Sequence, residues 1–310
     1  MYDAIVIGAR CSGASTALLL ARQGHRVLVV DRASFPSDVI STHFLWPHGM
    51  SYLNRWGLLD EVLAVTPAHT TVEVVNDGIS LTGSVPVELL REYFRDLHGD
   101  DSGVVQSYAS VRRRVLDQIL VDAAAGAGAE VRTGFTVREL VVEDGQVVGV
   151  RGRGADGEQV EERARIVVGA DGRNSFVART LGLPKFDERP RCTFAYWSYW
   201  SGFDLGPAQL HRRGRLACAV VPTNFDQNMC WSGGRASGRG SSAPTCRATT
   251  SGRWTSSARS WARRYGPGGS ARNASTAPWT SRPSCDRCTG PAGCWSVTPS
   301  RPRTSAPRSA

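Results

Sequence analysis

The chain has 310 residues, which is enough for two domains. Its formal net charge of +9 lies in one segment, because residues 231–310 contain 13 Arg and one acidic residue, Asp286, while the rest carries a small excess of acid. We therefore expect no nucleic-acid partner. The sequence contains no long apolar run and no signal peptide, so we expect a cytoplasmic protein that does not insert into a membrane. The sequence leaves the oligomeric state open.

Residues 4–31 predict a β-α-β unit. A short apolar strand at 4–7 and a second strand at 26–30 enclose a helix of small and aliphatic residues at 14–23, and Asp31 follows the second strand. This order is typical of dinucleotide-binding folds, in which the acid accepts hydrogen bonds from ribose hydroxyls. Its negative charge would repel a 2′-phosphate, so Asp31 favours NAD or FAD over NADP at this site.

The turn of this unit carries the residues that we expect to hold a pyrophosphate. Glycine at the first position permits the tight turn, glycine at the last lets the helix pack on the sheet, and the helix N-terminus attracts an anion. Arginine replaces the usual middle glycine, but its backbone N–H can still reach a phosphate and its guanidinium adds positive charge. The predicted dinucleotide contacts are Gly8, Ala9, Arg10, Cys11, Ser12, Gly13 and Ala14.

Hydrophobic periodicity predicts further elements along the chain. Turns are expected at Asn76-Asp77-Gly78 and Asp144-Gly145, and Asn174-Ser175 is expected to begin a helix. A longer helix is expected at 111–128, and strands at 70–79, 130–132, 137–142, 147–153, 164–169 and 193–200.

Four motifs together carry a specific resemblance that covers residues 2–230. They are Gly8 to Gly13, Asp31-Arg32, an Arg-x-x-Leu-Asp helix, and a Gly-Ala-Asp-Gly-Arg-x-Ser segment that ends at Ser175. They resemble FAD-dependent monooxygenases of the para-hydroxybenzoate hydroxylase type and, still more closely, geranylgeranyl-reductase-like oxidoreductases. The resemblance implies an α/β fold in which a Rossmann-like FAD-binding domain, with a parallel sheet and a three-stranded crossover, carries an inserted antiparallel-sheet substrate domain.

The resemblance also implies a discontinuous domain arrangement. An incomplete FAD-binding domain would comprise residues 1–68 and 109–185. A partial substrate domain would comprise residues 69–108 and 186–230, and residues 231–310 would form an irregular or disordered basic tail.

Further FAD contacts follow only from the resemblance. Arg113 would contact FAD, although a run of arginines is also typical of a solvated helix start, and Arg112 and Arg114 stay open as alternatives. The remaining contacts implied are those of Asp31, Arg32, Thr42, the backbone of Val137, Asp171 and Gly172.

Two groups of residues are candidates for contact with a substrate. His43 or His48 could transfer a proton at neutral pH, although a lone histidine is more often structural. Tyr196, Trp197 and Trp200 alternate along an aromatic strand and could line a flat hydrophobic pocket, with plain sheet packing as the alternative.

The resemblance implies that FAD carries the redox chemistry, with NADH or NADPH as reductant. We favour a monooxygenase that hydroxylates or epoxidises a small hydrophobic molecule, because the strand at 193–200 is aromatic. A reductase of carbon–carbon double bonds and a non-catalytic FAD-binding module are the alternatives. A halogenase is disfavoured, since such enzymes need a lysine in the first domain and Lys185 is the one lysine of this chain. Their Gly-Trp-x-Trp-x-Ile-Pro motif is also absent.

The segment 231–310 has the composition of a shifted reading frame. It contains no Leu, Ile, Phe, Met or Lys, so it cannot bury enough apolar surface to fold. Reading Pro291–Pro299 from the third base of the preceding codon permits Pro-Gly-Trp-Val-Leu-Val-Gly-Asp-Ala, a strand that ends in the Gly-Asp expected of the family near residue 300. We favour this frameshift over a genuine disordered tail, and it leaves the zinc-like pair Cys285 and Cys288 without meaning.

Overall fold

The computed structural model describes residues 1–39, 41, 43–188, 193–201 and 205–235. They fall into two units. The first comprises Met1–Thr71, Ser84–Arg189 and Thr223–Phe225, and the second comprises Val72–Gly83, Pro190–Pro222 and the residues from Asp226 onward. Residues 236–310 of the segment with the shifted frame, including Cys285 and Cys288, and the predicted FAD contact Thr42 lie outside the described residues.

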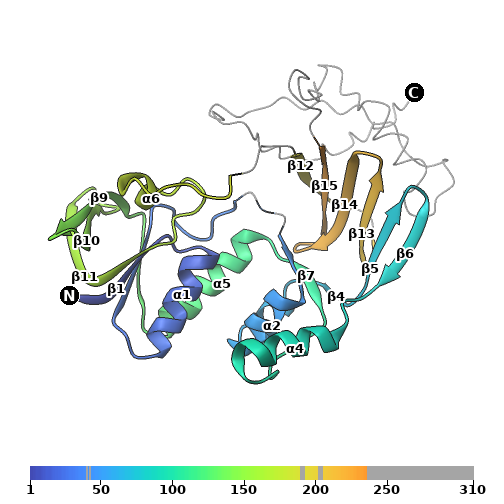
Figure 1. The fold of residues 1–310 in the computed structure, drawn as a ribbon, viewed down its shortest axis with the longest axis horizontal. Helices are drawn as coiled ribbons and strands as arrows, with labels where there is room; N and C mark the ends of the chain where they lie inside the picture. Colours follow the sequence, from blue (N-terminus) through green and yellow to red (C-terminus); the bar gives the residue numbers. More distant parts are fainter. Residues whose placement is uncertain (40, 42, 189–192, 202–204, 236–310) are drawn as a thin grey trace, which may run out of the picture. The chain divides into compact units, whose positions relative to one another are not determined.

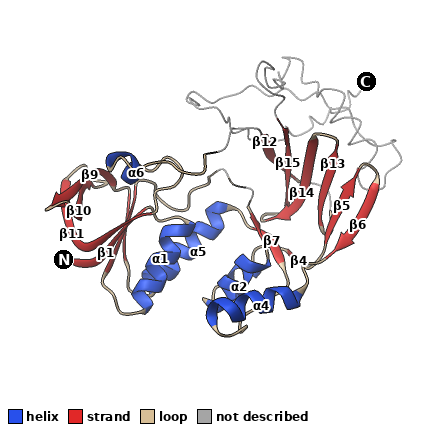
Figure 2. Cartoon of the chain, in the orientation of Figure 1, coloured by secondary structure: helices blue, strands red, loops and turns tan. Residues whose placement is uncertain are grey.

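The elements of both units are shown in Figures 1 and 2. The helices of the first unit are α1 (Cys11–Arg22), α2 (Pro47–Arg55), α3 (Leu59–Leu63), α4 (Val87–His98), α5 (Arg113–Gly126) and α6 (Phe176–Thr180). Its strands are β1 (Tyr2–Ile7), β2 (Val27–Asp31), β3 (Phe44–Leu45), β4 (Ala68–His69), β7 (Tyr108–Ser110), β8 (Glu130–Thr133), β9 (Thr136–Glu143), β10 (Gln146–Arg153) and β11 (Gln159–Gly169). The strands of the second unit are β5 (Val72–Asn76), β6 (Ile79–Gly83), β12 (Thr193–Trp200), β13 (Ala208–Arg213), β14 (Leu216–Thr223) and β15 (Gln227–Arg235).

The main sheet of the first unit has the strand order β8-β2-β1-β11-β10-β9. The first four strands are parallel, and β11, β10 and β9 form an antiparallel meander. Alternate residues of β1 are buried on opposite faces: Val6 joins the core beneath α1 and α5, whereas Ile5 and Ile7 join a second core beneath the meander. Helices α1 and α5 pack side by side (Figure 1). This confirms the predicted Rossmann-like sheet with its three-stranded crossover.

The meander turns where the sequence predicts. Asp144 and Gly145 have φ of 49° and 78°, the left-handed pair that a type I′ hairpin turn requires. On the exposed face, Arg151 bridges Glu139 and Glu161 at 2.6 and 2.7 Å. Exposed pairs of this kind contribute little stability individually, so the burial of apolar side chains holds the meander to the sheet.

The second unit contains a sheet of order β12-β15-β14-β13-β5-β6. The pairs β12–β15, β13–β14 and β5–β6 are antiparallel, whereas β13 and β5 are parallel. Strand β12 pairs with β15 from Thr193 opposite Arg235 to Trp200 opposite Asn228. Regular structure therefore includes the first five residues of the predicted tail, 231–235, because ladder bonds are made by the backbone and not by the side chains.

The bounds of the two units differ from those of the predicted domains at several segments, among them residues 84–108. Residues 84–108 belong to the first unit, not with the residues that the resemblance assigned to substrate. The reason is helix α4, which buries Leu90 and Phe94 completely, and the Phe94 ring lies 5.1 Å from that of Tyr52 on α2.

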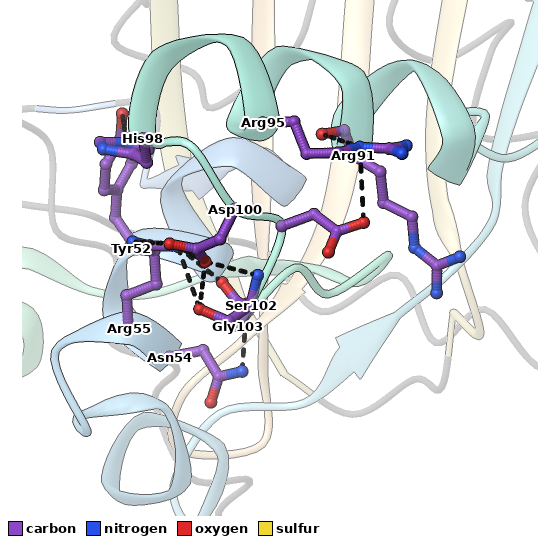
Figure 3. A network of polar contacts seen from close by, with 10 residues as sticks. Tyr52, Asn54, Arg55, Arg91, Arg95, His98, Asp100, Ser102 and Gly103 are labelled. Atoms are coloured by element: carbon purple, nitrogen blue, oxygen red, sulfur yellow. Dashed lines mark hydrogen bonds and ion pairs between the residues drawn. The ribbon is translucent and has the colours of Figure 1, made fainter.

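A polar network joins the loop after α4 to α2 (Figure 3). Arg55 donates to Asp100 at 2.8 Å and to the Ser102 carbonyl at 2.9 Å. Asn54 donates to the Gly103 carbonyl at 3.1 Å. Arg55 and Ser102 lower the pKa of the Asp100 carboxyl, so this carboxylate stays charged and the pairing persists at neutral pH.

Within the described residues, no helix combines the length and the apolar character that a membrane span needs.

Candidate functional site

The turn after β1 leaves no room for side chains at two glycines. Gly8 has φ of +103°, and a Cβ there would lie 2.4 Å from the Ala170 carbonyl oxygen. A Cβ on Gly13 would lie 1.7 Å from the Gly8 carbonyl oxygen. Helix α1 therefore begins at Cys11, three residues before the predicted start, with Gly13 inside its first turn. The close approach of the first turn of α1 to the end of β1 brings the free N–H groups of the helix start to that end of the strand.

Asp31 is fixed beside this turn. Its carboxylate accepts a hydrogen bond from the Ala9 N–H at 2.8 Å and from the Ala33 N–H at 2.8 Å. Its carbonyl accepts from the Phe135 N–H at 2.9 Å, which places the start of the meander beside it. The adjacent Arg32 is exposed. Recognition of ribose by Asp31 and a contact of Arg32 with FAD stay predictions.

Two guanidinium groups meet at one buried carboxylate. Asp117, on α5, has no exposed side-chain surface; Arg10 donates to it at 2.7 Å and Arg113 at 2.9 Å. Arg10 also donates to the Ser37 hydroxyl at 3.0 Å. The two arginines that the sequence singles out separately are thus brought together, and they meet two polar residues, Asp117 and Ser37, to which the sequence assigned no role. The Arg-x-x-Leu-Asp motif contained a signal for Asp117, but nothing in the sequence indicated Ser37.

Neighbouring arginines lie elsewhere. Arg112 forms an ion pair with Asp38, and the guanidinium of Arg114 lies 5.7 Å from the centre of the Phe225 ring. Of the three consecutive arginines, Arg113 is therefore the one held at the phosphate turn through Asp117.

Asp171 follows β11 directly next to the turn. The Ala170 N–H donates to the Ile7 carbonyl at 2.8 Å, so β11 and β1 end together. The Asp171 Oδ2 accepts from the Phe176 N–H at 2.5 Å at the start of α6. Its Oδ1 is buried and has no hydrogen-bond partner among the described residues. Gly172 is exposed with φ of +81°.

His43 is buried in an unusual backbone conformation. It has φ of 56° and is 3% exposed, and its carbonyl accepts from the Val111 N–H at 2.8 Å. Burial lowers the pKa of its imidazole to about 4, with Arg112 and Arg113 acting in the same direction and Asp38 and Asp117 opposing. The imidazole is therefore neutral at pH 7 and is a weaker base than an ordinary histidine. The other candidate, His48, is exposed on α2.

The remaining predicted residues lie on strands. Val137 on β9 is opposite Gly152 of β10, and its side chain packs against the core beneath the meander. In the second unit, Tyr196 and Trp197 are paired with β15 through their backbones. The Trp200 indole donates to the Ser198 hydroxyl at 2.6 Å. A role of these three aromatic residues toward a substrate stays a prediction.

The features of the first unit fit a dinucleotide. Strands β1, β2 and β11 end at one edge of the sheet, the edge at which such folds bind ligands. That edge presents a glycine turn, a fixed carboxylate at Asp31, two paired guanidinium groups and the Asp171 oxygen that lacks a donor. These groups can hold a pyrophosphate and the hydroxyls of an attached sugar.

A family model described as an FAD binding domain matches residues 1–203. The chain belongs to this family. The resemblance to FAD-dependent oxidoreductases seen in the sequence is thereby confirmed at the level of the family, and FAD is the dinucleotide to which the site corresponds.

Curated relatives include proteins of several kinds. Protein FixC of Escherichia coli strain K12 is 33% identical over 187 residues, which are 60% of this chain and 40% of FixC. Aklavinone 12-hydroxylase DnrF of Streptomyces peucetius subsp. caesius is 32% identical over 59% of this chain and 38% of its own. Digeranylgeranylglycerophospholipid reductase 2 of Methanopyrus kandleri is 31% identical over 63% and 44%. The chain thus spans about two-fifths of the length of these relatives.

Solved structures show the same fold. The flavin-dependent brominase Bmp2 matches with a TM-score of 0.59 and 19% identity over 75% of this chain and 55% of its own. PqsL of Pseudomonas aeruginosa, a probable FAD-dependent monooxygenase, matches with a TM-score of 0.59 and 22% identity over 76% and 60%. At such identities the similarity shows the fold alone.

Proposed function

We propose that this chain is the FAD-binding part of an NAD(P)H-dependent monooxygenase that hydroxylates or epoxidises a small hydrophobic molecule. The observation that carries the cofactor assignment is the turn between β1 and α1, in which the methyl groups that Gly8 and Gly13 lack would collide with backbone oxygens. The choice of reaction rests on the 32% identity to a protein named as a hydroxylase of aklavinone and on the aromatic strand β12.

The residues of the turn would bind and orient the cofactor. N–H groups at the start of α1, with Arg10 and Arg113, would hold the pyrophosphate, and the Asp31 carboxylate would accept from the ribose. Bound FAD would supply the redox chemistry, with NADH or NADPH as its electron source. The neutral imidazole of His43 would accept a hydrogen bond from a substrate hydroxyl, because a pKa of about 4 makes it too weak a base to take the proton.

Two alternatives rest on specific observations. The 31% identity to a protein named as a digeranylgeranylglycerophospholipid reductase favours a reductase of carbon–carbon double bonds. The match to a family model described as an FAD binding domain favours, as the second alternative, a module that binds FAD without catalysis.

Spectroscopy and oxygen consumption separate these functions. The purified 310-residue chain is titrated with FAD and then mixed with NADH or NADPH, with and without oxygen. A monooxygenase consumes oxygen and the reduced nucleotide and places ¹⁸O from labelled oxygen in an aromatic or polyene probe. A reductase saturates the polyene without oxygen. Bound FAD with no nucleotide oxidation indicates the module, and failure to bind FAD contradicts the proposed function.

A further inference from the structure

The carboxylate of Asp117 is the most deeply buried charge near the phosphate turn. Its side chain has no exposed surface and lies one turn into α5. A buried carboxylate is costly unless it is paired and hydrogen-bonded. Here it accepts from Arg10, from Arg113 and from the Cys11 thiol, whose sulfur lies 3.3 Å from Oδ1. Burial, and then the charge of Asp117, raise the pKa of this thiol to about 12, so the thiol keeps its proton for the contact.

One guanidinium would suffice to neutralise Asp117, yet two are held. The cluster of Arg10, Arg113 and Asp117 therefore keeps a net charge of about +1 at the start of α1. Neither α1 nor α5 has an acidic residue in its first turn, although acids are favoured there. The side chains of Arg10 and Arg113 are 24% and 17% exposed, so part of each guanidinium stays accessible. This surplus positive charge suits an anion that arrives from outside.

Arg10 also joins three segments that are distant in the chain. It is the residue before α1, it donates to Asp117 on α5, and it donates to the Ser37 hydroxyl at 3.0 Å and carbonyl at 3.3 Å. Arg10 thus occupies the position of the usual middle glycine, and Asp117 fixes the position of its guanidinium. A guanidinium that is already fixed by hydrogen bonds to Asp117 and Ser37 loses less conformational entropy on binding a phosphate than a mobile guanidinium does.

We propose that Asp117 is a positioning residue for the phosphates of the dinucleotide and that it acts through Arg10 and Arg113. The inference rests on the proposed FAD site and deepens it. Asp117 itself would not touch the ligand. It fixes two cations, one in the turn before α1 and one at the start of α5, so that the arginine in place of glycine strengthens the phosphate site.

The test compares ADP with adenosine, which differ only in the phosphates. Their dissociation constants are measured by calorimetry for the 310-residue chain and for Asp117→Asn, with Asp122→Asn as the matched control, because Asp122 is an exposed acid on the same helix that accepts from Gln118. Asp117→Asn should weaken ADP about tenfold and leave adenosine unchanged. Asp122→Asn should change neither.

A second variant separates positioning from folding. Arg10→Gly restores the usual glycine and should weaken ADP binding about tenfold. In the Arg10→Gly background, Asp117→Asn should change the ADP dissociation constant less than it does in the unsubstituted chain. If circular dichroism shows that Asp117→Asn fails to fold, Arg10→Gly alone tests the inference, through the ratio of the ADP and adenosine dissociation constants. Unchanged or stronger ADP binding, or equal losses for ADP and adenosine, overturns the inference while the FAD site stands. Absence of both FAD and ADP binding in the unsubstituted chain overturns the proposed function and this inference with it.

Discussion

Gly13 is the position of the phosphate turn with the least room for one methyl group. A Cβ there would lie 1.7 Å from the Gly8 carbonyl oxygen, so Gly13→Ala must displace the backbone of the turn. We expect a loss of about 1–3 kcal/mol in the free energy of unfolding and weaker FAD binding. Urea unfolding and FAD titration measure both. Gly126→Ala is the control, because a Cβ at Gly126 meets nothing within 4 Å; equal losses in the two variants would contradict the argument.

His43 should make stability depend on pH. Its pKa is lowered to about 4 in the folded chain, mainly by burial, so between its ordinary value and 4 the unfolded state binds more protons. The stabilisation is complete above the unfolded pKa and is lost as the pH falls toward 4. We expect the native chain to lose about 2 kcal/mol more than a His43→Asn variant between pH 7 and pH 5.

The comparison uses asparagine because asparagine does not titrate and tolerates the left-handed backbone of His43, whose φ is 56°. Urea unfolding at both pH values gives the two differences. Parallel pH dependence of the native chain and the variant would show that His43 titrates normally.

The sequence indicates individual residues where the chemistry is local. The roles of Gly8 and Gly13 as glycines follow from their spacing, and the structure shows the close contacts that require them. The pairing of Arg10 with Asp117 spans 107 positions, and its contact with Ser37 spans 27. No periodicity or motif spacing encodes such contacts, because they depend on how α1 packs against α5.

At the scale of elements, Asn224, which belongs to the first unit, joins several segments of that unit. The Asn224 side chain is buried; it accepts from the Arg112 N–H at 2.8 Å and donates to the Val65 carbonyl at 2.7 Å and the Thr66 hydroxyl at 2.6 Å. Asn224→Ala leaves these groups without their partner, and we expect a loss of about 3 kcal/mol in the free energy of unfolding.

Thermal or urea unfolding measures this effect against Asn174→Ala. Asn174 is exposed, and its carbonyl, not its side chain, accepts from Arg179 at 2.6 Å, so its replacement should change stability by less than about 0.5 kcal/mol. Similar effects of the two substitutions would mean that water replaces the bonds of Asn224.

Elements were predictable where a local pattern decides them. Strand β12 has the predicted bounds because its residues alternate, and the turn at Asp144-Gly145 has the backbone that its two residues favour. The start of α1 was placed late, since Gly13 reads as loop until its contact with Gly8 is known. The packing of α4 in the first unit was not predictable, because it depends on Phe94 packing against Tyr52, a contact between separate helices.

At the scale of the whole molecule, the main sheet has an open edge. Strand β11 pairs with β10 up to Arg163, and from Ala164 to Gly169 its one partner among the described residues is β1. Ile166 in this half is 56% exposed, because β11 is the outermost strand of the parallel part of the sheet. An apolar strand with one open side is a site for a further parallel strand.

The frame hypothesis supplies such a strand, and it predicts that resequencing the coding DNA will find a base lost or gained near codon 230. A gene with the frame restored should then encode Val-Leu-Val-Gly-Asp where the present reading has residues 294–298. If that strand covers β11, Ile166→Asp should cost the restored protein about 2 kcal/mol in unfolding free energy and leave the 310-residue chain nearly unchanged. Ile79→Asp, at a side chain that is 67% exposed in the second unit, should affect neither. A coding sequence that confirms the present frame would refute the hypothesis, and the basic segment would then be a genuine part of a chain with an incomplete flavin site.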